Sequence, residues 1–69
     1  MLQFNDLTKF KHFIDLNKIT NVVIRPHEND FVAAFHFGCN HFVAATVDRQ
    51  TVNEIKIKLT NYGGTEHAL

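Results

Sequence analysis

The stretch DFVAAFHFGCNHFVAATVD, residues 30–48, carries the clearest structural signal in this sequence. Two runs rich in β-branched and aromatic residues flank residues 38–41 (GCNH), which is typical of a β-hairpin. We place the two middle residues of GCNH in a two-residue loop, so that Phe37 faces Phe42 across the strands. Directly opposed residues share a face of the sheet, so this register divides the hairpin into two faces.

The face that carries the phenylalanines is the predicted core. Its members are Phe31, Ala33, Phe35, Phe37, Phe42, Ala44 and Thr46. The opposite face is also apolar, with smaller side chains, and little of this short chain remains to cover it. It carries Val32, Ala34, His36, Val43, Ala45 and Val47, with His41 at its end. We therefore expect a contact surface there for a protein partner or for a second copy of the chain in a homodimer.

The segments before the hairpin predict one helix and one short strand. Helical spacing of apolar residues predicts a helix over about residues 6–17, capped by Asn5 or Asp6. The stripe consists of Leu7, Phe10, Phe13 and Ile14. β-Branched residues before Pro26 predict a short strand at 22–24, followed by a turn.

Residues 51–62 fit two patterns. Apolar residues alternate with lysines over 55–59, as in a strand, but Val52, Ile55 and Leu59 also form a helical stripe. The spacing of Thr51 and Glu54 is that of a capping box, and Gly63 is placed to end a helix. We favour the helix and keep the strand as the alternative.

These elements define an α+β domain of order α-β-β-β-α. Both helices would cover one face of a three-stranded antiparallel sheet. The domain would span residues 1–63, and residues 64–69 would form a flexible tail.

Within this domain the order of elements and the position of Pro26-His27 before Phe31 resemble the double-stranded RNA-binding domain. The segment TVNEIK, residues 51–56, lies where that family has a lysine-rich helix start, and Lys56 matches one of its lysines. The resemblance implies binding of duplex RNA.

Bulk composition narrows the classes of function. Seven basic and seven acidic residues cancel, which disfavours a dedicated nucleic-acid binder. One cysteine cannot form an internal disulfide, and the charged N-terminal segment is no signal peptide, so we expect a cytoplasmic protein.

The histidine-cysteine hairpin is a weak candidate for chemistry. His36, Cys39 and His41 are three possible metal ligands, but structural zinc usually takes four, so we expect neither a metal nor another cofactor. A cysteine–histidine nucleophile would need an acid and an oxyanion hole, which the pattern does not supply. Carboxylates are scattered and serine is absent, so we expect no enzyme.

The leading hypothesis is a non-enzymatic protein–protein interaction module. A neutral single domain of this size with no cofactor motif suits an accessory or inhibitor protein, of the kind that phages and mobile elements encode. The alternative is a nucleic-acid-binding domain of double-stranded RNA-binding-like topology, with contacts from a basic surface. Its candidate residues are Lys9, Lys11, Arg25, Arg49, Lys56 and Lys58.

Overall fold

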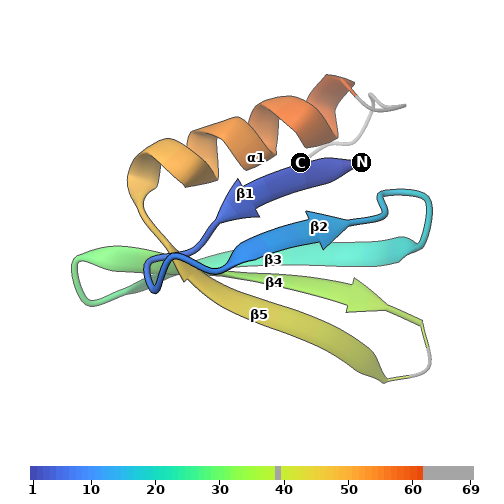
Figure 1. The fold of residues 1–69 in the computed structure, drawn as a ribbon. Helices are drawn as coiled ribbons and strands as arrows, with labels where there is room; N and C mark the ends of the chain where they lie inside the picture. Colours follow the sequence, from blue (N-terminus) through green and yellow to red (C-terminus); the bar gives the residue numbers. More distant parts are fainter. Residues whose placement is uncertain (39, 62–69) are drawn as a thin grey trace.

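The computed structural model describes residues 1–38 and 40–61 of the chain (Figure 1). The elements are β1 (Leu2–Asn5), β2 (Lys11–Ile14), β3 (Ile19–His27), β4 (Asp30–Phe37), β5 (His41–Val47) and α1 (Arg49–Asn61). β1 and β2 form one antiparallel hairpin, and β3, β4 and β5 form a three-stranded antiparallel sheet in that order. The predicted α+β class and three-stranded antiparallel sheet are confirmed, but the order of elements is β-β-β-β-β-α.

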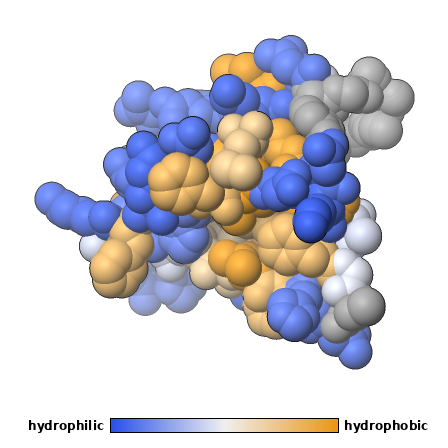
Figure 2. Space-filling view, turned by 45° about the vertical axis from the view of Figure 1, so that its right-hand side comes forward, coloured by the Kyte–Doolittle hydropathy of each residue, from blue (hydrophilic) through white to orange (hydrophobic). Residues whose placement is uncertain are grey.

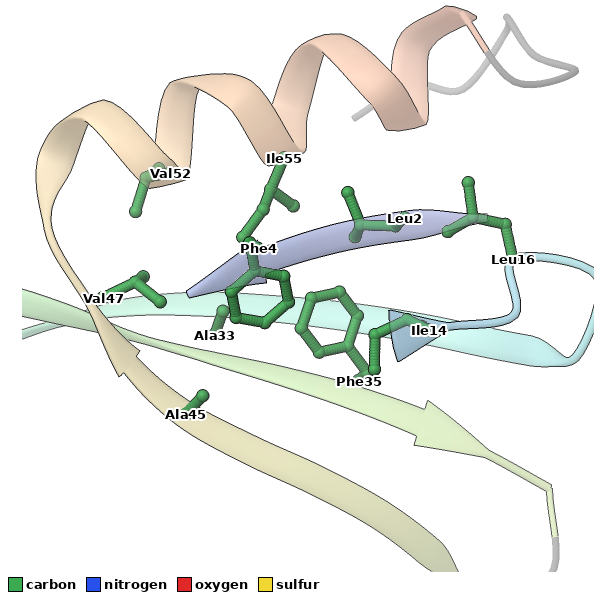
Figure 3. Packing of buried hydrophobic residues seen from close by; sticks show 10 residues of the cluster. All are labelled: Leu2, Phe4, Ile14, Leu16, Ala33, Phe35, Ala45, Val47, Val52 and Ile55. Carbon is green, nitrogen blue, oxygen red and sulfur yellow. The ribbon is translucent and has the colours of Figure 1, made fainter. Parts of the chain in front are cut away.

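The core lies between the three-stranded sheet and a layer made by the β1–β2 hairpin and α1 (Figure 1). Figure 3 shows Val52 and Ile55 pointing from α1 toward the strands. In the same view the Phe35 ring lies between the Phe4 ring and the Ile14 side chain. The buried cluster consists of Leu2, Phe4, Ile14, Leu16, Ala33, Phe35, Ala45, Val47, Val52 and Ile55. Hairpin and helix therefore both cover the same face of the sheet.

The predicted helix over residues 6–17 is wrong, because these residues form the turn and second strand of a hairpin. Two aspartates direct the local fold. The Asp6 carboxylate accepts the Thr8 N–H at 2.9 Å, and the Asp15 carboxylate accepts the Asn17 N–H at 3.0 Å. Such i to i+2 bonds satisfy the backbone in turns and compete with the helix. Asp6 is therefore a turn residue and not a helix cap.

The predicted register of the β4–β5 hairpin is wrong by one residue. Phe37 pairs with His41, and Phe35 pairs with Val43, so the loop has three residues, 38–40. Asn40 has a left-handed φ of 65°, a conformation common at the end of three-residue hairpin loops and tolerated by asparagine. Because side chains alternate along a strand, this slip reverses the direction of every side chain on β5.

β3 is longer than the strand predicted at 22–24, and it includes Pro26, which pairs with Phe31. A proline is tolerated there because β3 is at an edge of the sheet and pairs only with β4 in the described chain.

The last segment is a helix, as favoured, but it starts earlier than the sequence predicted. The Asp48 carboxylate accepts the Thr51 N–H at 2.8 Å, so Asp48 is the N-cap and Thr51 does not cap the helix. This bond, and the Thr51 hydroxyl, lower the pKa of Asp48 below its ordinary value. Gly63 and the predicted tail at 64–69 lie outside the described residues, so the structure does not test the helix stop or the domain boundary.

We expect Phe35→Ala to cost about 3–5 kcal/mol of folding free energy, because the ring is fully buried at the centre of the core. Urea denaturation followed by circular dichroism measures this loss. Phe13→Ala is the matched control, since that ring is 60% exposed, and we expect a change within about 0.5 kcal/mol. Equal effects of the two substitutions would contradict the packing described here.

Candidate functional site: the open face of the sheet

The side of the three-stranded sheet that faces away from β1, β2 and α1 is uncovered by any described element (Figure 1). The strand registers place nine side chains on it in three rows. The rows are Asn21–His36–Phe42, Val23–Ala34–Ala44 and Arg25–Val32–Thr46. We call these nine residues the open face.

The open face has a small apolar centre and one large aromatic residue. Ala34 lies between Val23 and Ala44 and is buried by these neighbours, although no element of the described chain covers it from outside. The Phe42 ring is 58% exposed and stacks on His36 with the ring centroids 5.4 Å apart. The surface of the open face is therefore flat along the middle row and raised where Phe42 projects.

The structure divides the predicted contact surface between the two faces of the sheet. Val32, Ala34 and His36 lie on the open face as predicted. Val43, Ala45 and Val47 were placed there wrongly, because the one-residue slip turns them toward the core. His41 pairs with Phe37 on the core-facing side, exposed at the end of the strand.

The open face also contains residues that the sequence analysis missed. Phe42 and Ala44 were assigned to the core, and Asn21 and Val23 were not considered as contact residues. Asn40 is the residue from which the correct register could have been predicted. An asparagine at the last loop position readily takes the left-handed conformation, which favours a three-residue loop over a two-residue loop.

The six predicted basic contact residues do not form one surface. Arg25 lies on the open face, whereas Lys56 and Lys58 lie on α1, on the opposite side of the sheet (Figure 1).

The other three predicted basic residues, Lys9, Lys11 and Arg49, lie together at one end of the molecule. The Leu7 N–H donates to the Thr46 carbonyl oxygen at 2.9 Å, which ties the β1–β2 turn to the end of β5, just before α1. Lys9, Lys11 and Arg49 therefore lie at the same end of the molecule, with the Arg49 guanidinium 5.3 Å from the centre of the Phe31 ring.

The two histidines of the hairpin do not share a face. His36 lies on the open face and His41 on the core-facing side, which separates two of the three candidate metal ligands. The third, Cys39, lies outside the described residues. Within residues 1–38 and 40–61, no three histidine, cysteine or acidic side chains are grouped closely enough to hold a metal ion.

A polar cluster in the β1–β2 hairpin surrounds Asp6. Its carboxylate accepts bonds from the His12 Nε2–H at 2.8 Å, the Thr8 N–H and hydroxyl at 2.9 and 2.7 Å, and the Phe10 N–H at 3.0 Å. The His12 ring also stacks on Phe4 with centroids 5.0 Å apart, which joins the cluster to the core. The bond from His12, followed by those from Thr8 and Phe10, holds the pKa of the Asp6 carboxyl far below its ordinary value.

No protein-family model, curated protein or solved structure matches this chain. Among the described residues, no helix has both the length and the apolar character needed to cross a membrane.

Folding stability should depend on the charge of Asp6. Its pKa is lower in the folded than in the unfolded chain, so the carboxylate stabilises the fold above its unfolded pKa of about 4, and the contribution is lost as pH falls below that value. We expect Asp6→Asn to lower the melting temperature at neutral pH, and the difference from the parent to shrink below about pH 4.

Thermal unfolding followed by circular dichroism at a series of pH values measures this difference. Asp15→Asn is the control, because the Asp15 side chain accepts one hydrogen bond, from Asn17, whereas the Asp6 side chain accepts four. A gap between Asp6→Asn and the parent that stays constant from neutral to acid pH would contradict the assigned role.

Proposed function

We propose that this chain is a non-enzymatic protein-binding module that holds a partner protein on the open face. The observation that carries the proposal is the second apolar face of the sheet. Residues on the other face already form the buried core with the hairpin and α1, so the open face is not needed to complete that core. Apolar surface exposed beyond the needs of the core is typical of sites of protein association.

The composition of the open face suits a protein surface. Its middle row of Val23, Ala34 and Ala44 is uncharged, and interface centres are depleted in charged residues. Phe42 is the candidate anchor, because exposed aromatic side chains that enter a pocket on the partner contribute much of the binding energy in protein complexes.

Arg25 defines a polar requirement for the partner. It is the one Lys, Arg, Asp or Glu in the three rows and makes no ion pair with the other described residues. A carboxylate at the matching edge of the partner would pair with its guanidinium at the rim of the interface. The expected partner therefore presents a flat apolar surface with an acidic edge.

The size of the open face indicates a reversible complex. Three strands about 4.8 Å apart, with rows about 6.8 Å apart, give a patch on the order of 15 Å by 20 Å. That is less than the roughly 800 Å² that each partner buries in a standard stable complex. A small reversible binder fits an accessory or inhibitor role, and an origin in a phage or mobile element stays a prediction from chain size.

A second candidate function, nucleic-acid binding, has support from one observation. Lys9, Lys11 and Arg49 lie at the same end of the molecule, with Lys9 in the turn between β1 and β2 and Lys11 at the start of β2. The support comes from these residues and not from the order of elements, since a hairpin stands where the double-stranded RNA-binding domain has its first helix.

Site-specific photo-cross-linking tests the protein-binding proposal. A photoreactive amino acid at position 42 should give a discrete adduct in cells of the source organism, and the same residue at position 57, an exposed position of α1, should not. We expect Ala44→Asp, which places a charge in the middle row, to abolish the adduct. Gln3→Asp is the matched control, because Gln3 is also an exposed strand residue but lies on the β1–β2 hairpin and not on the open face.

Both aspartate variants should unfold cooperatively near the temperature of the parent, since the substituted side chains are exposed. An adduct of twice the chain mass would identify the partner as a second copy of the chain. An adduct that survives Ala44→Asp would show that the open face is not the binding site.

A further inference from the structure

The outer side of the β1–β2 hairpin exposes large hydrophobic side chains beside lysines. Phe10 is 70% exposed and Phe13 is 60% exposed, and both are next to or near Lys11. Figure 2 shows hydrophobic side chains reaching the surface at separate places among hydrophilic ones. We call Lys9, Phe10, Lys11 and Phe13 the hairpin strip.

The strand register fixes the exposure of Lys11 and Phe13, whereas Lys9 and Phe10 lie in the turn before β2. His12 and Ile14 point toward the core, with His12 against Phe4 and Ile14 in the buried cluster, so Lys11 and Phe13 must point outward. Across the hairpin, Phe13 is opposite Gln3, which gives the ring no apolar neighbour in the cross-strand position. Phe13 is therefore held on the outer surface by the same pairing that builds the core.

The hairpin strip carries positive charge that no described acid neutralises by an ion pair. Lys9 and Lys11 are exposed, and neither forms an ion pair with another described residue. Four carboxylates lie at this end of the molecule: those of Asp6 and Asp48, and those of Glu28 and Asp30 at the β3–β4 turn (Figure 1). None of them forms an ion pair with Lys9 or Lys11. Asp6 is bonded within its own turn, and Asp48 caps α1, so both are already occupied by donors of the chain.

We propose that the hairpin strip binds single-stranded nucleic acid. Unpaired bases would stack on the rings of Phe10 and Phe13, and the ammonium groups of Lys9 and Lys11 would contact the phosphates between them. The alternation of cations and exposed rings matches the alternation of phosphates and bases along a single strand.

Two features favour this ligand over others. Lysine is depleted at the centre of protein interfaces, whereas two of the four residues of the hairpin strip are lysines. The bases of a duplex are stacked on one another and present no free face to a phenylalanine ring, so the rings favour a single strand. This surface is separate from the open face, so the inference does not depend on the protein-binding function proposed for that face. It specifies the ligand of the second candidate function, nucleic-acid binding, through the same Lys9 and Lys11.

Fluorescence anisotropy with labelled oligothymidylate and oligouridylate of about ten nucleotides, titrated at several salt concentrations, tests the proposal. Two phosphate contacts predict a slope of log affinity against log salt of about −1.4, at about −0.7 for each phosphate. Lys9→Gln and Lys11→Gln should each reduce the slope by about 0.7. Phe13→Ala should weaken binding about tenfold and leave the slope unchanged.

The matched controls are Phe42→Ala and Lys58→Gln, which remove an exposed ring and an exposed lysine from other surfaces. We expect both to bind as the parent does. The proposal is overturned by no binding at the lowest salt, by equal loss in Phe42→Ala and Phe13→Ala, or by tighter binding of a duplex of the same length. Binding of vesicles rich in anionic lipid that depends on Phe13, with no binding of the oligonucleotides, would overturn it in favour of a membrane surface.

Discussion

The stacking of Phe4 on Phe35, with ring centroids 5.6 Å apart, joins the β1–β2 hairpin to the three-stranded sheet. Phe35 is at the middle of β4, the central strand, and is fully buried. Ile14 and the α1 residue Ile55 pack into the same cluster (Figure 3). In a chain of 69 residues this cluster must supply most of the burial, because a domain so small has room for one core only.

Once Phe35 fixes one face of the sheet as the core, the opposite face is fixed as well. Side chains alternate along each strand, so Ala34 and His36 must point outward, and cross-strand pairing places Phe42 and Ala44 beside them. The same rule acts on the β1–β2 hairpin, where the stacking of His12 on Phe4 places Phe13 on the outer side. The two proposed binding surfaces are thus consequences of the packing that stabilises the fold. One surface is nearly uncharged and the other is basic, which is why they suit different ligands.

Part of this arrangement could be predicted from the sequence and part could not. The β4–β5 hairpin follows from two β-rich runs around a loop, and the helix follows from the stripe of Val52, Ile55 and Leu59. The helix expected over residues 6–17 was a wrong prediction, because aromatic residues at helical spacing also occur in a hairpin with exposed phenylalanines. The expected grouping of all four hairpin phenylalanines on one face was also wrong, since Phe42 is a surface residue. Loop length, which sets the register, depends on a single left-handed residue, Asn40.

Local patterns in the sequence were sufficient to predict an α+β chain, a hairpin over residues 30–48 in an antiparallel sheet, and a second apolar face beyond the one that forms the core. These properties follow from periodicity and composition, which every short segment carries. Three-dimensional packing was needed to establish which side chains belong to the exposed face and which basic residues lie together. The physical reason is that a one-residue shift in register costs little in local propensity but reverses a whole strand, and the packing of Ala45 and Val47 of β5 into the core selects between the alternatives.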